Sequence, residues 1–217
     1  MPITPTFFIE HEYWSQGVGH IAGIDEAGMG ALAGPVVAGA VIFSESALEK
    51  ILEHSNKIPI RDSKLLSEKQ REKAFEFITE LADSYSIGEA SVEEIDALNI
   101  RNASHLAMRR AIENLSPEPD MLLIDGTSNT IHPTIFSLSV VKGDQLSYSI
   151  AAGSILAKVT RDRIMKQLDP THPEYGFISH KGYGAKQHLD ALAKYGVTPH
   201  HRKSYAPIAR LLTKEAA

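Results

Sequence analysis

Acidic residues follow apolar segments at three separate places in the sequence. Asp25 ends the segment HIAGID and is followed by Glu26 and a glycine-rich turn, and Asp125 ends LLID, again before a glycine. Asp144 follows another apolar run and a Lys-Gly pair. A single acid in such a place is more typical of a turn or a helix cap. Three of them together predict one cluster at the edge of an open α/β sheet, where such folds bind ligands.

Carboxylates that gather without basic partners repel each other, and divalent cations between them relieve that repulsion. Oxygen ligands favour Mg²⁺ or Mn²⁺ over zinc. Two such ions roughly 4 Å apart activate a water and stabilise the leaving oxygen in a phosphoryl displacement. This chemistry needs no protein nucleophile, which suits a chain without cysteine. We therefore predict that Asp25, Glu26, Asp125 and Asp144 are both the metal ligands and the catalytic residues.

The charge of the chain is unevenly distributed. The net charge is −5, but residues 1–141 carry 10 Lys/Arg against 21 Asp/Glu, whereas residues 142–210 carry 11 against 5. A basic segment after an acidic body fits contact with nucleic-acid phosphates, and a solvated surface is the alternative. No basic segment followed by an apolar stretch is seen at the start, so we expect no leader, and no apolar run approaches the ~20 residues that span a bilayer. We expect a soluble, cytoplasmic protein with no membrane contact.

Hydrophobic periodicity and capping signals predict strands that alternate with helices. The capping boxes that begin at Ser67 and Ser91 mark two helix starts. The predicted strands are 20–25, 35–43, 84–90, 121–125 and 135–141, and the predicted helices are 67–83, 102–115, 147–168, 185–196 and one from about 207 to the end. This order indicates an α/β fold with a mixed sheet covered by helices.

Several longer motifs carry a resemblance to a known family. They are GIDEAGMGALAGPVVAGAV (23–41), DSKLLSEKQRE (62–72), LLIDG (122–126), VVKGD (140–144), SIAAGSILAKVTRDR (149–163) and HKGYG (180–184). In this order they closely resemble bacterial ribonuclease HII. The resemblance implies a ribonuclease H-like fold, with a five-stranded mixed sheet flanked by helices and a small C-terminal helical extension. We accordingly expect an N-terminal extension (1–19), a catalytic domain (20–170) and a helical substrate-binding part (171–217) within one unit.

The resemblance also implies an activity. It predicts an endoribonuclease that hydrolyses the RNA strand of RNA–DNA hybrids and cleaves at ribonucleotides embedded in duplex DNA, leaving 5′-phosphate and 3′-hydroxyl ends. Matching motifs assign the family's four metal-binding acids to Asp25, Glu26, Asp125 and Asp144. A monomer is expected. The string QLSY (145–148) is faintly similar to a sliding-clamp peptide, but it lies beside the predicted metal site, so clamp binding is unsupported.

Asp162 competes with Asp144 for the fourth place because it also lies in a matching motif. It falls inside a predicted helix, four residues before Lys166, which is the spacing of an ordinary surface ion pair. An acid at the end of a strand reaches the sheet edge more easily. We therefore predict that Asp144 is the ligand and that Asp162 is structural.

In the family, a glycine-containing turn recognises the ribonucleotide. In the family, a Gly-Arg-Gly turn approaches the 2′-hydroxyl through main-chain groups, and its arginine contacts phosphate. Here the turn is Gly28-Met29-Gly30, and Ala31 stands where proline is usual. Glycine still permits close backbone approach. Met29 forms no charge-assisted bond to phosphate, so either single-ribonucleotide preference is weaker or other basic residues compensate.

Further substrate contacts are assigned by the same resemblance. Tyr183, in HKGYG, matches a family tyrosine that stacks on the sugar beside the RNA–DNA junction, although a lone tyrosine is more often a core or rim residue. Ser63, Lys64, Lys142 and Lys181 are the predicted phosphate contacts. The alternative is that some of these lysines are only solvated.

Four histidines near the C-terminus raise the question of a zinc site. They are His180, His188, His200 and His201. Their spacing matches no familiar zinc ligand set, so we expect surface or phosphate-contacting side chains.

Two alternative functions stay open. One is ribonuclease HIII, which lacks the arginine turn but has an additional N-terminal domain; only about 19 residues precede the first strand here. The other is a non-catalytic protein that binds hybrids and retains its acids for stability. The presence of all four acids disfavours it.

Overall fold

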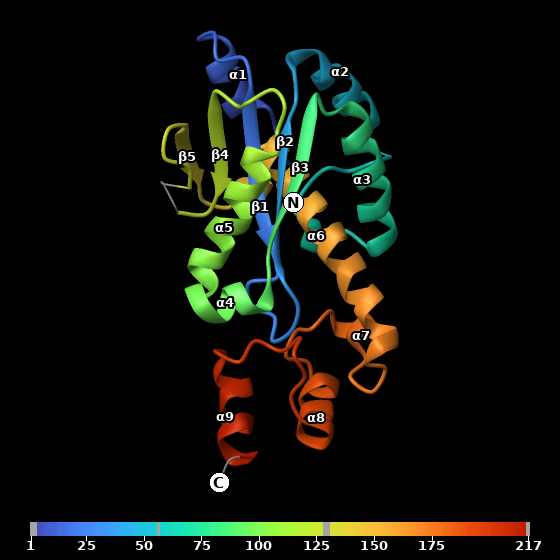
Figure 1. Ribbon diagram of the computed structural model, residues 1–217. Helices are drawn as coiled ribbons and strands as arrows, with labels where there is room; N and C mark the ends of the chain where they lie inside the picture. Colours follow the sequence, from blue (N-terminus) through green and yellow to red (C-terminus); the bar gives the residue numbers. More distant parts are fainter. Residues whose placement is uncertain (1–3, 56, 128–130, 216–217) are drawn as a thin grey trace.

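The computed structural model describes residues 4–55, 57–127 and 131–215. Its centre is a five-stranded sheet in the order β3-β2-β1-β4-β5 (Figure 1). The strands are β1 (Ile21–Ala27), β2 (Val36–Ile42), β3 (Ser84–Ala90), β4 (Met121–Asp125) and β5 (Phe136–Val140). β1, β2 and β3 pair antiparallel, whereas β1, β4 and β5 pair parallel. The predicted five-stranded mixed sheet is confirmed.

The parallel pair β1–β4 brings two acidic strand ends together. Ile24 of β1 pairs with Ile124 of β4, so the residues that follow each of them leave the sheet at the same edge. β5 then adds Val140 opposite Asp125. The C-terminal helices lie at the end of the molecule toward which β1 runs (Figure 1).

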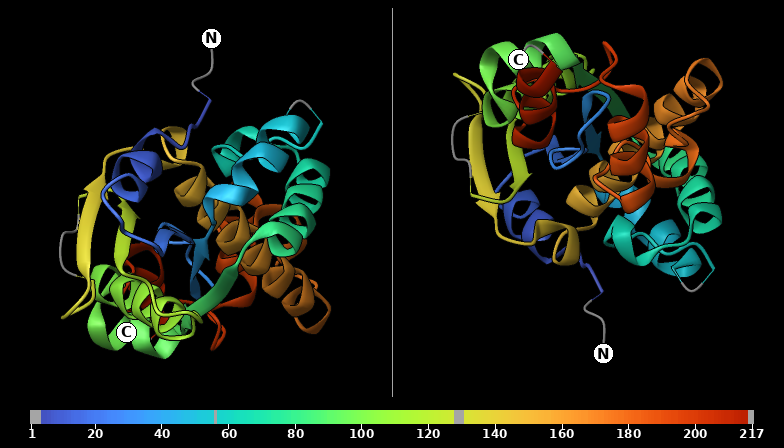
Figure 2. Two further views of the ribbon diagram at one scale, coloured as in Figure 1. Left: turned by 90° about the horizontal axis from the view of Figure 1, so that it is seen from above. Right: turned by 90° about the horizontal axis from the view of Figure 1, so that it is seen from below.

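Two long helices cover the two faces of the sheet (Figure 2). α6 (Tyr148–Leu168) packs on β1 and β2, and α5 (Ile100–Glu113) packs on β2 and β3. α6 approaches the sheet closely because glycines face each other at the contact: a Cβ on Gly39 would lie 2.4 Å from the Gly153 carbonyl oxygen. The small residues at the start of α6 thus hold this helix against the strand that carries the first two acids.

The remaining helices divide into those that the sequence predicted and those that it did not. They are α1 (Phe8–Trp14), α2 (Glu45–His54), α3 (Glu68–Leu81), α4 (Val92–Leu98), α7 (Phe177–His180), α8 (Lys186–Tyr195) and α9 (Ala206–Glu215). Both capping boxes are present, at the starts of α3 and α4. α1, α2 and α7 were not predicted. Short 3₁₀ turns occur at η1 (Ser63–Leu65), η2 (Gly143–Gln145) and η3 (Asp169–Thr171).

The C-terminal helices share a hydrophobic cluster with the body of the protein. Phe177 and Leu192 pack there with Leu32, from the loop after β1, and with Met165 of α6. The proposed boundary at residues 170/171 therefore stays a prediction. In the described part of the chain, no helix is both long enough and apolar enough to cross a membrane.

Candidate active site at the edge of the sheet

The four predicted acids meet at the edge formed by β1 and β4. Asp125 is the last residue of β4, and its Oδ1 accepts a hydrogen bond of 2.6 Å from the Gly143 amide. That bond ties β4 to η2, which carries Asp144. Asp125 acts electrostatically on each of the other three acids. It is therefore the centre of the cluster.

The sequence predicted that the first strand ends at Asp25, but β1 continues to Ala27 because it pairs with β2 that far, so Asp25 and Glu26 both lie inside it. Successive strand residues point to opposite faces of a sheet. Accordingly, Ser154 of α6 acts on Asp25 and Ser104 of α5 acts on Glu26, and each serine opposes the rise in the pKa of its acid. The two neighbouring acids thus receive support from helices on different faces.

The environment of the acids disfavours their charged forms. Burial, then repulsion from Glu26 and Asp125, raises the pKa of Asp25 well above its ordinary value. Burial and then Asp125 raise the pKa of Glu26 to about 7, although nearby Lys64 lowers it. Burial, then Asp62 and Asp125, raises the pKa of Asp144 to about 6. Such crowding of like charges is relieved when a cation binds between the carboxylates.

Asp62 is a member of this cluster that the sequence analysis missed. It begins η1, and its Oδ1 accepts a 2.9 Å hydrogen bond from the Lys64 amide. It is nearly buried and raises the pKa of Asp144. The signal was available, since Asp62 is the first residue of the motif DSKLLSEKQRE, whose Ser63 and Lys64 were assigned to phosphate.

The donor set fits hard divalent cations. All the crowded side chains offer carboxylate oxygens, the ligands that Mg²⁺ and Mn²⁺ prefer. Within residues 4–55, 57–127 and 131–215, no three histidine or acidic side chains are already arranged as a closed set of metal ligands.

A cleft of about 510 Å³ opens beside Asp25 and Glu26. Most of the predicted substrate residues line it: Gly28, Met29, Gly30, Ser63, Lys64 and Tyr183, together with Ser154 and Lys158. Lys142 and Lys181 are not among its lining residues. Lys142 is exposed next to η2, and the Lys181 ammonium group donates to the Ile178 carbonyl. The structure thus brings the turn, the serine and the tyrosine together, but not every predicted lysine.

The Gly28-Met29-Gly30 turn is fixed by its main chain. Gly28 has φ +101°, and a Cβ there would lie 2.0 Å from Nε of Arg161. The Met29 carbonyl accepts hydrogen bonds from Arg202, at 2.9 Å, and from the Tyr205 hydroxyl. The Met29 side chain is 36% exposed. The turn therefore holds its shape without an arginine side chain.

Arg161 and Arg202 support this turn, and the sequence analysis assigned neither a role. Both are fully buried. Arg161 donates to the carbonyls of Ala33, Pro35 and Lys181, so it connects the loop after β1 to the Tyr183 loop. Its guanidinium also lies over the Tyr183 ring, 5.2 Å from the centroid. Burial lowers the pKa of Arg161 to about 10. Its place in the motif VTRDR was the available signal.

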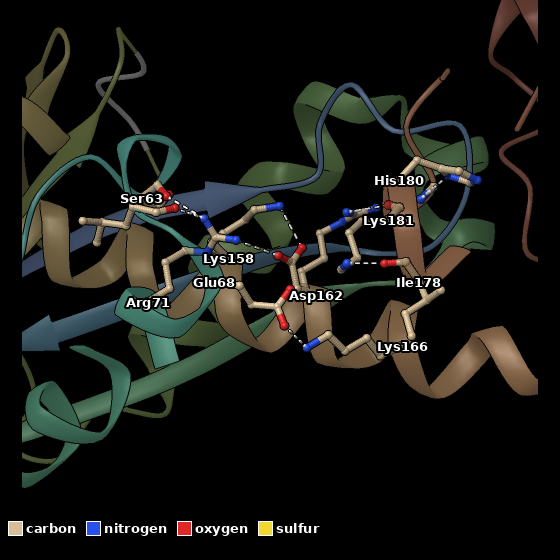
Figure 3. A network of polar contacts seen from close by, with 12 residues as sticks. Ser63, Glu68, Arg71, Lys158, Asp162, Lys166, Ile178, His180 and Lys181 are labelled. Atoms are coloured by element: carbon tan, nitrogen blue, oxygen red, sulfur yellow. Dashed lines mark hydrogen bonds and ion pairs between the residues drawn. The ribbon is translucent and has the colours of Figure 1, made fainter. Parts of the chain in front are cut away.

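Asp162 is held in a buried ion-pair network (Figure 3). Its Oδ1 lies 2.8 Å from the Lys158 ammonium group and its Oδ2 lies 3.6 Å from Arg71. The expected partner was wrong, because Lys166 pairs with Glu68 instead, at 2.7 Å. The expected surface location was also wrong, since Asp162 is almost fully buried. Its carboxylate is neutralised by protein cations, which suits a structural role better than metal binding.

The expectation for the histidines was wrong for two of them. His188 and His201 are fully buried, and their Nε2 atoms lie 3.0 Å apart. They therefore contact neither solvent nor phosphate. No zinc ligand set is found among the described histidines and acids.

Comparisons with known proteins point to one family. The family model described as Ribonuclease HII matches residues 22–208. Ribonuclease HII of Clostridioides difficile is 52% identical over 90% of this chain and 73% of its own, and Ribonuclease HII 1 of Methylibium petroleiphilum is 50% identical over 90% and 94%. The crystal structure of the ribonuclease H2 from Pyrococcus horikoshii superposes with a TM-score of 0.74 and 26% identity, covering 90% of this chain and 98% of that one. The chain belongs to the ribonuclease HII family of metal-dependent endonucleases.

Proposed function

We propose that this ribonuclease HII hydrolyses the RNA strand of RNA–DNA hybrids and also cleaves at ribonucleotides embedded in duplex DNA, leaving 5′-phosphate and 3′-hydroxyl ends. The observation that carries the proposal is the position of Asp125. It interacts with Asp25, Glu26 and Asp144 at one sheet edge, and the glycine turn lies in the adjoining cleft. A nucleic-acid strand in this cleft would pass directly beside the acids.

Asp25, Glu26, Asp125 and Asp144 would hold Mg²⁺ or Mn²⁺. When bound, such ions activate a water and stabilise the leaving oxygen. The crystal structure of Bst-RNase HIII in complex with Mn²⁺ has the same fold, with a TM-score of 0.66 and 16% identity. We include Asp62 as an acid that raises the local negative charge and favours cation binding.

Substrate recognition in this proposal combines main-chain and aromatic contacts. Gly28 and Gly30 let the backbone approach a ribose 2′-hydroxyl. Tyr183 is 37% exposed at the rim of the cleft and offers a ring for stacking on a sugar. Ser63 and Lys64 line the same cleft and would contact phosphate. Lys142 and Lys181 belong to the proposal as outer phosphate contacts.

Clamp binding is not part of the proposal. A ribonuclease HII from Archaeoglobus fulgidus has been solved in a complex with PCNA, and its fold matches this one with a TM-score of 0.71 and 24% identity. The string QLSY offers no free peptide here, because Ser147 and Tyr148 are buried at the start of α6.

A cleavage assay with an Asp125→Asn variant tests the proposal. The substrates are a labelled RNA–DNA hybrid and a DNA duplex with one ribonucleotide, each with Mg²⁺ and with Mn²⁺. We expect the rate on both substrates to fall by about a thousandfold, because the central carboxylate is lost. Products of the parent should carry 3′-hydroxyl ends that a polymerase extends. Parent-like activity of the variant would refute the assignment.

The same assay separates the enzyme from a non-catalytic hybrid-binding protein. A protein that only binds would retard the labelled hybrid on a gel without shortening it, in every metal. The catalytic proposal instead expects Asp125→Asn to retain hybrid binding when cleavage is lost, since the cleft and its turn stay in place.

A further inference from the structure

The buried histidines form an ordered chain of hydrogen bonds that ends on the Tyr183 loop. The Thr198 amide donates to Nδ1 of His201 at 3.0 Å. Nε2 of His201 faces Nε2 of His188 at 3.0 Å. Nδ1 of His188 lies 2.9 Å from the Tyr183 carbonyl oxygen. The chain therefore runs from one loop to another through two imidazole rings.

The two ends of this chain determine where each proton lies. A backbone amide only donates, so Nδ1 of His201 is unprotonated, and the Thr198 hydroxyl, 2.9 Å from the same nitrogen, then donates to it as well. The ring proton of His201 is therefore on Nε2. A carbonyl oxygen only accepts, so Nδ1 of His188 carries the proton and its Nε2 accepts from His201. Every donor then meets an acceptor. Only two neutral rings satisfy this arrangement, because a second proton on either ring would place two N–H groups face to face.

A third histidine supports the same loop in the same way. The Gly182 amide donates to Nδ1 of His180 at 3.2 Å, and Nε2 of His180 lies 2.9 Å from the Tyr175 carbonyl oxygen. The His180 ring stacks on His188 with centroids 4.6 Å apart. The main chains of two adjacent residues, Gly182 and Tyr183, are thus each held by a histidine.

We propose that His188, ordered by His201, is a positioning residue that sets the Tyr183 ring for substrate stacking, and that it does so only as the neutral Nδ1–H tautomer. The inference rests on the proposed role of Tyr183 at the substrate. His188 touches no substrate itself; it fixes the carbonyl of the residue that does. The charge-bearing groups that act on the pair are His172, His180 and His200, all of which disfavour a further positive charge there.

Two matched amide variants test the positioning role. In His188→Asn the side-chain amide stands where Nδ1 was and still donates to the Tyr183 carbonyl. In His188→Gln the amide is one methylene farther out, where Nε2 was, and the bond to Tyr183 is lost. Both variants remove the same ring from the cluster, so a purely structural role predicts the same kinetic change in each.

We expect KM for the RNA–DNA hybrid, with Mg²⁺ at pH 7.5, to rise about tenfold in His188→Gln and about twofold in His188→Asn, with kcat changed less than twofold in both. In a Tyr183→Ala background the His188→Gln substitution should add no further change. Parent KM should rise between pH 6 and 4.5, and that of His188→Asn should rise less, because its amide does not titrate. Equal KM values for the two variants, or an undiminished effect without the Tyr183 ring, would overturn the proposal.

The tautomers are measured directly in the parent protein, so the test does not depend on whether a variant folds. With ¹⁵N-labelled histidine, long-range ¹H–¹⁵N correlation spectra at pH 6.5 should show a proton on Nδ1 of His188 and on Nε2 of His201. The opposite tautomers, or an imidazolium signal, would overturn the relay. A Tyr183→Ala variant with parent-like KM would instead remove the proposed substrate contact, and an active Asp125→Asn variant would remove the proposed catalysis.

Discussion

The acid cluster at the ends of β1 and β4 and the histidine pair beneath Tyr183 both bury ionisable side chains, but their surroundings differ. Around Asp25 the nearest ionisable groups are other carboxylates, which raise its pKa further. Around His188 and His201 each ring nitrogen has a partner of the correct kind. The repulsion among the acids is not cancelled by Lys64 or by their hydrogen bonds, whereas every ring nitrogen of the two histidines is matched.

This difference follows from what each cluster has to do. Unmatched carboxylates retain strong affinity for a cation, so their unfavourable charge is the source of metal binding. Matched imidazoles have no such capacity, and their hydrogen bonds serve geometry. Buried titratable residues therefore indicate chemistry where their partners are missing and positioning where their partners are complete.

The largest expected contrast comes from the same substitution at two buried acids, Asp25 and Asp162. Asp25→Asn should lower cleavage by about a thousandfold but leave the metal-free protein at least as stable, since it removes repulsion. Asp162→Asn should lower the unfolding free energy by about 3 kcal/mol, because Lys158 and Arg71 lose their buried partner. Urea denaturation with EDTA measures the stability of the two variants, and the hybrid assay measures cleavage. A loss of stability in Asp25→Asn as large as that in Asp162→Asn would contradict the distinction.

Gly28 follows the acids of β1, and Arg161 supports the Tyr183 loop through the Lys181 carbonyl, so the contact of Gly28 with Arg161 connects the two regions. Gly28→Ala should lower the unfolding free energy by about 2–3 kcal/mol, because its φ is positive and its Cβ would press on the buried guanidinium. Gly30→Ala is the matched control, since no atom lies within 4 Å of a Cβ there. Its thermal midpoint should stay near that of the parent. Equal thermal midpoints for Gly28→Ala and Gly30→Ala would mean that the Arg161 side chain moves away from the added methyl group at little cost.

The two clusters should give pH dependences of stability with opposite signs. Burial lowers the pKa of His201 to about 4, so between that value and its ordinary one the unfolded chain binds more protons, and acidification destabilises the fold. Glu26, with a pKa of about 7, binds more protons when folded, so acidification from pH 7 to 5 stabilises the metal-free fold. Urea denaturation with EDTA at pH 7 and pH 5 measures how much unfolding free energy is lost on acidification. This loss should be larger in Glu26→Gln than in the parent, and smaller in His201→Gln than in the parent. The reverse ranking would contradict the pKa assignments.

The smallest expected effect concerns the turn. Met29→Arg should raise the preference for a single embedded ribonucleotide over a long hybrid by about two- to fivefold, the value of one exposed charge contact. Met29→Gln is the control, because it adds polarity without charge. Competition between two differently labelled substrates measures the ratio. An unchanged preference would mean that other basic residues already supply the phosphate contact.

The sequence predicted those features that local residue patterns determine. The box of Ser67 and Gln70 marked the start of α3, and the apolar run before Asp125 marked β4. α1 and α2 were missed because their apolar residues pack on distant partners: Phe7 against Tyr148, and Ile51 in the same cluster. The segment of α2 did carry a local signal that was missed, since Ala47, Leu48 and Ile51 recur at helical spacing after Ser44.

Within the site, the sequence predicted which acids occur but not how they are paired. Its position after a strand favoured Asp144 over Asp162, while the actual partners of Asp162 come from α3 and from the preceding turn of α6. Asp62, Arg161 and His188 acquire their roles only through contacts across the fold. Such partners lie far apart in the chain, and one sequence does not reveal them.

The placement of Asp25 and Glu26 on adjacent positions of β1 makes the activity a reporter of strand register. A slip of one residue between β1 and β2 would exchange the two faces, moving Asp25 toward α5 and Glu26 toward α6. A misregistered molecule could retain a compact shape, but its carboxylates would no longer meet Asp125. The specific activity of a refolded preparation thus measures the fraction of molecules with the correct strand register. Spectra of secondary structure do not distinguish these molecules from misregistered ones.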